Sequence, residues 1–254
     1  MTTEAPCPDC QDTGWVPAEA GGRSAVRRCG CVLARRSAAR LERARIPKRY
    51  QACTFANFEL HNDSHKRGVM IARKLLENFP SQDIGLLFIG PPGVGKTHLA
   101  AALLGELVQA KGASGLFYDF RDLIRDIQET YASDSGRSEA DILAPVFDSD
   151  AVLFDELGAK RPTAWVEETI FSIVNHRYNR RKLTLFTSNF LDTGDEEDRR
   201  QPMFKKPDPL RKGDDSLVDR IGYRLRSRIY EMCKVVPMEG EDYRKLVKQA
   251  GYRF

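Results

Sequence analysis

Residues 90–97 read GPPGVGKT and fit the pattern G-x-x-x-x-G-K-T between an apolar run and a helical one. The stretch consists of Gly90, Pro91, Pro92, Gly93, Val94, Gly95, Lys96 and Thr97. Its glycines let the backbone turn tightly, so that main-chain amides surround a phosphate at the start of a helix. Lys96 would bring a positive charge to the β- and γ-phosphates, and the Thr97 hydroxyl would ligate magnesium. The pattern therefore predicts a site for ATP with magnesium.

Around this loop, residues 50–190 alternate short apolar runs with amphipathic stretches. This alternation predicts a parallel α/β sheet whose strands are buried on both faces. We expect strands at Leu86–Gly90, Gly115–Phe120, Ala151–Asp155, Thr184–Asn189 and near Val235–Met238. We expect helices at 64–79, 96–111 and 163–180, the last with an apolar face made of Val166, Ile170, Ile173 and Val174.

Polar residues stand at the ends of two of these strands. Asp155 would hold magnesium through water, and Glu156 would polarise the attacking water as a general base. Asn189 would orient that water beside the γ-phosphate. Acidic residues are common at strand ends, and Asn often only forms a turn. The position of Asp155 and Glu156 some sixty residues after the phosphate loop favours the catalytic interpretation.

Four cysteines near the start of the chain form two pairs, Cys7 with Cys10 and Cys29 with Cys31. Four thiolates in this spacing fit a tetrahedral structural zinc site, which would supply most of the folding free energy of a segment with few apolar residues. Incidental free cysteines and a redox pair are the alternatives. The two remaining cysteines, at positions 53 and 233, are expected to be buried structural thiols.

Composition limits the class of protein. The 254 residues are 41% hydrophobic and 30% charged, and no apolar run approaches the ~20 residues of a membrane helix. With no secretory signal at the start, we expect a cytoplasmic protein without membrane contact. Positive charge gathers in residues 33–49, which hold seven Lys or Arg against one Glu, and again after residue 199. Such segments suit nucleic acid or an acidic partner, unless they are ordinary solvated faces.

The last third of the chain contains two distinct segments. Residues 191–216 are rich in charge and proline, which predicts a long loop. Residues 217–233 predict a helix with a core-facing stripe of Leu217, Ile221, Leu225 and Ile229. A second stripe consists of Arg220, Arg224 and Arg228. It is either a solvated face or the source of an arginine finger for a neighbouring subunit.

Several motifs in order carry a family resemblance: GPPGVGKTHLA, FDELGAKRPTAWVEE, RYNRRKLTLFTSN, and RLRSRIYEMC followed by GEDYR. Together they resemble the bacterial AAA+ helicase loaders of the DnaC/DnaI type, and equally the IstB-like transposition helper ATPases. The resemblance covers about residues 50–254. It implies a P-loop AAA+ (ASCE) domain with a five-stranded parallel sheet in the order 5-1-4-3-2.

The same resemblance implies roles for single residues. Residues 90–97 would be Walker A, Asp155 and Glu156 Walker B, and Asn189 sensor 1. Arg228 best matches the arginine finger, with Arg224 as second choice. The segment 120–143 lies where the initiator clade engages single-stranded DNA. About twenty-five residues follow Arg228, so we expect a minimal lid or none, no sensor-2 arginine, and weak ATPase activity.

These expectations divide the chain into a partner-binding segment, 1–46, with zinc and a basic helix, and an ATPase domain, 47–254. The function expected from the resemblance is to load the replicative DNA helicase onto single-stranded DNA, as a homo-oligomer in the ATP state. One alternative is a transposition helper ATPase that assembles on duplex DNA. Another is a nucleotide-dependent binding module with negligible turnover.

Overall fold

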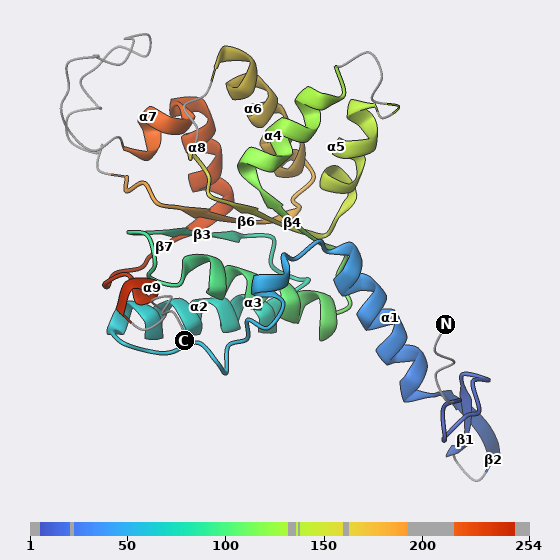
Figure 1. The fold of residues 1–254 in the computed structure, drawn as a ribbon. Coiled ribbons are helices and arrows are strands. Elements are labelled where there is room, and N and C mark those ends of the chain that lie inside the picture. Colours follow the sequence, from blue (N-terminus) through green and yellow to red (C-terminus); the bar gives the residue numbers. More distant parts are fainter. Residues whose placement is uncertain are drawn as a thin grey trace, which may run out of the picture.

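The computed structural model of the chain describes residues 6–20, 23–131, 136, 138–159, 163–192 and 216–246. Figure 1 shows one sheet with helices on both of its faces, and a small hairpin held away from this body at the end of a long helix. Most of the expected loop at 191–216 lies outside the described residues.

The main sheet has five parallel strands. They are β3 (Gly85–Ile89), β4 (Gly115–Asp119), β5 (Ala151–Asp155), β6 (Leu183–Ser188) and β7 (Cys233–Pro237). Their order across the sheet is β4-β5-β6-β3-β7. Numbered in chain order from β3 and taken from the β7 edge, this is 5-1-4-3-2, which confirms the expected fold class. Every residue of β3, β5 and β6 is buried, as continuous apolar runs require.

Helices cover the two faces unequally (Figure 1). One face carries α2 (Asp63–Asn78), α3 (Lys96–Gln109) and, beside them, the short α9 (Tyr243–Leu246). The other carries α4 (Phe120–Glu129), α5 (Glu139–Asp148), α6 (Ala164–Asn179), α7 (Leu217–Ile221) and α8 (Tyr223–Met232). The three helices expected from periodicity agree with α2, α3 and α6 to within two residues at each end.

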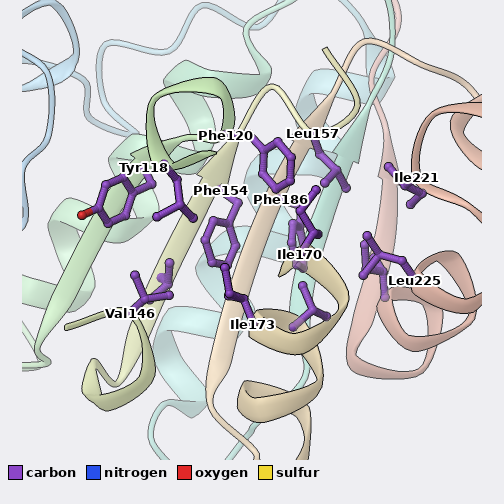
Figure 2. Packing of buried hydrophobic residues seen from close by; sticks show 14 of the residues in the cluster. Tyr118, Phe120, Val146, Phe154, Leu157, Ile170, Ile173, Phe186, Ile221 and Leu225 are labelled. Atoms are coloured by element: carbon purple, nitrogen blue, oxygen red, sulfur yellow. The ribbon is translucent and has the colours of Figure 1, made fainter. Parts of the chain in front are cut away.

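The core consists of one apolar cluster on each face of the sheet. On the face shown in Figure 2, Phe154 of β5 stacks on Phe186 of β6 at 5.5 Å between ring centroids. Ile170 and Ile173 of α6 pack in the same cluster as these rings, and both are buried, as their helical spacing predicts. This packing holds β5 and β6 side by side.

The expected helix at 217–233 is two helices. Gly222 adopts φ 77°, a left-handed conformation that interrupts the helix between α7 and α8. Ser216 and Asp219 form a capping box that starts α7. The apolar stripe is nevertheless confirmed, because all four of its residues are buried: Leu217, Ile221, Leu225 and Ile229.

The N-terminal part consists of the antiparallel hairpin β1 (Trp15–Ala20) and β2 (Arg23–Arg28), then α1 (Gly30–Arg43) and a 3-10 turn at Lys48–Tyr50. None of the residues of α1 is buried. The chain joins the main body just after α1, where Ala44 and Ile46 enter the core. The Phe117 amide of the edge strand β4 donates to the Ala44 carbonyl at 2.7 Å. The chain directly after α1 is thus hydrogen-bonded to the sheet at β4.

No helix in the described part of the chain combines the length and the apolar character needed to span a membrane.

The buried side chain of Arg177 links α6 to the amino ends of the strands. Arg177 is fully buried and donates to the carbonyls of Val146 (2.6 Å), Ser149 (3.0 Å) and Leu183 (2.6 Å). It also donates to the Thr184 hydroxyl at 3.0 Å. Burial lowers the pKa of Arg177 to about 9. Each bonded acceptor would lose its partner if this side chain were removed.

We therefore expect Arg177→Met to lower the free energy of unfolding by about 3 kcal/mol, because the new side chain fills the space but satisfies none of the acceptors. Urea unfolding followed by circular dichroism measures the change. Arg180→Met, at the exposed position directly after the same helix, is the matched control. Equal stabilities of the two variants would contradict a structural role for the buried guanidinium.

Candidate functional site

The carboxyl ends of the parallel strands meet at one edge of the sheet, where ligands bind in folds of this type. The phosphate loop follows β3, and Asp155 ends β5. Asp119 ends the edge strand β4, and Thr187 lies one residue before the end of β6. Residues that are far apart in the sequence therefore surround one site.

The phosphate loop has the conformation that its glycines predict. Gly93 and Gly95 have φ values of 82° and 93°, and α3 begins at Lys96. The Lys96 ammonium donates to the carbonyls of Gly90 (2.8 Å) and Pro91 (2.7 Å). Burial lowers the pKa of Lys96 to about 8, while the Asp155 carboxylate opposes this effect. The ammonium thus lies inside the loop, where a phosphate is expected.

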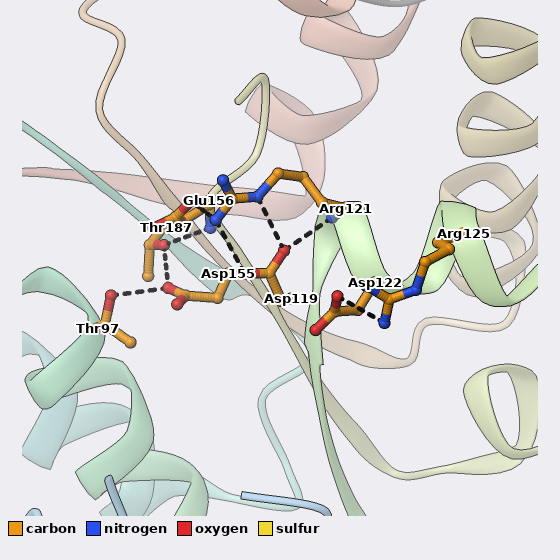
Figure 3. Close-up of polar contacts among 8 residues, drawn as sticks. All are labelled: Thr97, Asp119, Arg121, Asp122, Arg125, Asp155, Glu156 and Thr187. Carbon is orange, nitrogen blue, oxygen red and sulfur yellow. Dashed lines mark hydrogen bonds and ion pairs between the residues drawn. The ribbon is translucent and has the colours of Figure 1, made fainter. Parts of the chain in front are cut away.

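Asp155 joins three elements at the site (Figure 3). Its Oδ1 accepts hydrogen bonds from the hydroxyls of Thr97, at 2.8 Å, and Thr187. Burial raises the pKa of Asp155, and these two hydrogen bonds act in the opposite direction. A hydroxyl beside a carboxylate is the hard oxygen donor set that magnesium prefers, so Thr97 and Asp155 fit the expected ion.

Glu156 follows β5 in a left-handed conformation, φ 58°, and its amide donates to the Thr187 hydroxyl at 3.0 Å. Its carboxylate forms an ion pair with Arg121 of α4. Arg121 also contacts Asp119, with 3.3 Å between Nη2 and Oδ2, and this contact is the main cause of its raised pKa. The expected general base is therefore held by an arginine that sequence reasoning did not identify.

Asn189 lies one residue beyond β6, and its side chain is exposed. The β6 side chain that contacts the carboxylates is instead that of Thr187, two residues earlier. Strand periodicity could have pointed to Thr187, because side chains two positions apart on a strand, such as those at 187 and 189, share a face. The assignment of Asn189 to the attacking water stays a prediction.

The three candidate finger arginines all stack on aromatic rings. The Arg228 guanidinium lies 4.4 Å from the Tyr178 ring centroid, near the end of α6. Because β7 starts at Cys233, directly after α8, Arg228 lies toward the amino ends of the strands, opposite its own phosphate loop. The other two are Arg220, over Phe190, and Arg224, over Phe171.

A segment after β7 returns to the phosphate loop. The Met238 amide donates to the Ile89 carbonyl at 2.8 Å, and the Tyr243 amide donates to the Gly93 carbonyl at 3.3 Å. Arg244 follows, and its charge is one of the causes that lower the pKa of Lys96. No arginine after α8 was expected at this site. The GEDYR sequence at 240–244 was part of the resemblance but received no role.

The structure brings the four N-terminal cysteines together. All four Sγ atoms lie within 4.8 Å of one another, with 3.7 Å between Cys7 and Cys29 and 3.4 Å between Cys10 and Cys31. Tetrahedral zinc with Zn–S bonds of about 2.3 Å separates its sulfurs by about 3.8 Å. The donor set and spacing therefore fit zinc. Of the other two cysteines, Cys233 is buried and the one at position 53 only partly so.

Comparisons with known proteins also indicate a site that binds ATP. The family model described as IstB-like ATP binding protein matches residues 32–251. The replicative helicase loader DnaC of Buchnera aphidicola subsp. Baizongia pistaciae is 29% identical over 149 residues, 59% of this chain and 60% of that protein. DnaC of Escherichia coli K12 is 29% identical over 147 residues, 58% of this chain and 59% of that protein. The chain thus spans about 60% of the length of these curated relatives.

A crystal structure of the DnaC helicase loader aligns with a TM-score of 0.62 and 32% sequence identity, over 76% of this chain and 100% of that one. The family match includes the phosphate loop, both acidic residues at the end of β5 and the α8 arginines. The fold is that of an AAA+ domain, and the chain belongs to the IstB-like ATP-binding protein family.

Proposed function

We propose that this protein is a replicative helicase loader that binds and hydrolyses ATP and engages single-stranded DNA. The observation that supports this most is the likeness to the DnaC loader at 32% identity over the whole of that solved chain. The nucleotide site supports the ATP-dependent part, because its hydroxyl, carboxylate and ammonium groups converge at one edge of the sheet.

In this proposal the phosphate loop binds the triphosphate, and Lys96 exchanges its two carbonyl contacts for phosphate oxygens. Thr97 and Asp155 hold magnesium, which would neutralise charge on the phosphates. Arg244 follows Tyr243, whose amide contacts the phosphate loop at Gly93, and is our candidate for a group that acts on the γ-phosphate of its own chain. These groups orient the nucleotide.

Hydrolysis requires a base for the attacking water, and Glu156 is our candidate. The Arg121 guanidinium occupies an oxygen of this carboxylate that would otherwise contact the attacking water. We therefore propose that the Arg121 ion pair keeps basal turnover low, and that a bound partner releases Glu156. Weak activity of the isolated protein follows from this arrangement.

We propose a homo-oligomer in the ATP state. Because Arg228 lies opposite its own phosphate loop, the γ-phosphate that it could contact belongs to a neighbouring copy. The ring of Tyr178 supports the guanidinium in position. The arginine would stabilise negative charge on the transferred group, as arginine fingers do.

The N-terminal hairpin and the first turn of α1, which contains Leu33, are our candidate for the helicase contact. Exposed apolar side chains gather on this small module: Trp15 is 50% exposed, Val26 67% and Leu33 58%. Exposed apolar groups of this size are typical of protein-binding surfaces. The module projects away from the sheet (Figure 1), so a partner bound there would leave the nucleotide site accessible.

Size-exclusion chromatography with the replicative helicase of the same organism, with and without ATP, tests the proposed function. We expect a co-eluting complex that Val26→Asp disrupts. Met70→Asp, at an equally exposed apolar position on α2, is the matched control. If no complex forms and the protein instead assembles on duplex DNA with ATP, the loader function is wrong and a transposition helper is favoured.

A phosphate-release assay tests the role of the Arg121 pair. Arg121→Ala should raise basal ATP turnover severalfold, because it frees Glu156, while Arg125→Ala on the same helix should leave turnover unchanged. Lys96→Ala and Glu156→Gln should abolish turnover. Retained hydrolysis in both of these variants would contradict the site. If the protein and its variants bind ATP but none hydrolyses it, a nucleotide-dependent binding module is the favoured function.

Metal analysis tests the cysteine cluster. Purified protein should contain about one zinc per chain, held by four thiolates. Cys7→Ser should reduce the zinc content and weaken helicase binding while leaving ATP binding intact, and the control Cys53→Ser should change neither. Protein prepared with ample zinc that contains almost none would show that the cysteines are not a zinc site.

A further inference from the structure

Positive charge is distributed unevenly among the surface helices. α1 contains four arginines and one glutamate. α4 and α5, which cover the segment where the resemblance implies contact with single-stranded DNA, together contain two arginines and six carboxylates. Binding to a phosphate backbone depends on unneutralised cations, so the two regions differ in what they offer to DNA.

Both arginines of α4 are already engaged. Arg121 is paired with Asp119 and Glu156 at the nucleotide site. Arg125 lies 2.9 Å from Asp122 and 3.7 Å from Glu129, within its own helix (Figure 3 shows the first of these pairs). In the part of α4 and α5 that the structure describes, no positive charge is left without a carboxylate beside it.

The arginines of α1 are arranged differently. Arg36, Arg40 and Arg43 follow one another at spacings of four and three residues, which places them on one face of the helix. All three are exposed, and no carboxylate in the described part of the chain forms an ion pair with them. Four residues of helix advance about 6 Å, so the charges form a continuous row.

This row leads into a groove of about 860 Å³ between the end of α1, the beginning of β4 and the end of α5. Arg40, Arg43 and Arg45 line one side. The Arg40 guanidinium lies over Gly112, 3.0 Å from the place that a Cβ on this glycine would take. The lack of a side chain at position 112 therefore leaves room for the guanidinium in the groove.

Two acidic residues also line the groove, Glu42 and Asp150. The Asp150 carboxylate accepts hydrogen bonds from the Ser114 amide (3.0 Å) and hydroxyl (2.7 Å), and Lys182 lies 3.3 Å away. Burial acts to raise the pKa of Asp150, but the Ser114 hydrogen bonds and Lys182 together outweigh it, and the pKa is lowered. The charge of Asp150 is thus offset locally by Lys182, and the three arginines that line the groove outnumber the remaining carboxylate, Glu42, so the groove is positive.

We propose that the α1 row and this groove bind the phosphate backbone of single-stranded DNA. The inference rests on the proposed function and assigns a surface to it. A positively charged groove that follows the backbone is how single strands are bound without sequence preference. A flexible strand can enter a groove of this size, whereas the wide, stiff duplex would contact only its rim. Among the described residues that line the groove, Leu116 and Pro145 are the only large apolar ones, which disfavours a protein partner.

Fluorescence anisotropy with labelled oligothymidine and a labelled duplex, over a series of salt concentrations, tests this surface in the full-length protein. The test variant is Arg36→Ala/Arg40→Ala/Arg43→Ala. The control is Lys66→Ala/Arg67→Ala/Lys74→Ala, which removes the same charge from exposed positions of α2. Circular dichroism and helicase co-elution check that each variant is folded and still binds its partner.

We expect the α1 variant to bind oligothymidine at least tenfold more weakly, with a salt slope lower by about two, since each lost phosphate contact on a single strand contributes about 0.7. The α2 control should match the unmodified protein.

Unchanged binding by the α1 variant, or an equal loss in the control, would overturn the assignment while leaving the loader function intact. The assignment would also be overturned if the α1 variant no longer bound the helicase but still bound oligothymidine. That result would indicate that the arginine row contacts an acidic protein partner. If the unmodified protein binds no single strand at low salt, both this inference and the DNA-binding part of the proposed function fail, and helicase co-elution then decides whether loading survives.

Discussion

The Asp155 carboxylate is the contact on which the nucleotide site depends. It accepts hydrogen bonds from Thr97, at the start of α3, and from Thr187, in β6. These bonds form because β5, β6 and β3 are neighbours in a parallel sheet, so that their carboxyl ends meet. Burial makes the charge of Asp155 costly, and the two hydroxyls offset part of that cost. The backbone turn after it places Glu156 beside Arg121.

The edge strand β4 connects this site to the N-terminal module. In its middle, Phe117 donates to the Ala44 carbonyl just after α1. At its end, Asp119 contacts the arginine that holds Glu156. β4 therefore contacts both the residue that follows α1 and the arginine that pairs with Glu156, the group proposed to activate water. The module itself has a minute core of Cys10, Val16 and Cys29, which is why metal is the natural source of its stability.

Pairing determines what each arginine can do. Arg177 is buried and donates hydrogen bonds to backbone carbonyls, while Arg121 forms an ion pair with a candidate catalytic carboxylate. Arg226, the middle arginine of α8, is bound by the Asp192 carboxylate, with 2.6 Å between Nη2 and Oδ2. The Arg228 guanidinium stacks on the Tyr178 ring toward the amino ends of the strands. The arginines of α1 face solvent. A count of positive charges along the sequence treats all of these residues alike.

The sequence by itself determined the features that short segments encode. The glycines of the phosphate loop, the apolar strands, the periodicity of α2, α3 and α6, and the cysteine spacing each depend on neighbours along the chain. Only the tertiary structure decided that Thr187 contacts Asp155, that Arg121 holds Glu156, that the Tyr243 segment contacts the phosphate loop at Gly93, and that Gly222 divides the last long helix. The physical reason is that these contacts join residues some 30 to 150 positions apart. Their partners are set by strand order and packing, and no local pattern contains that information.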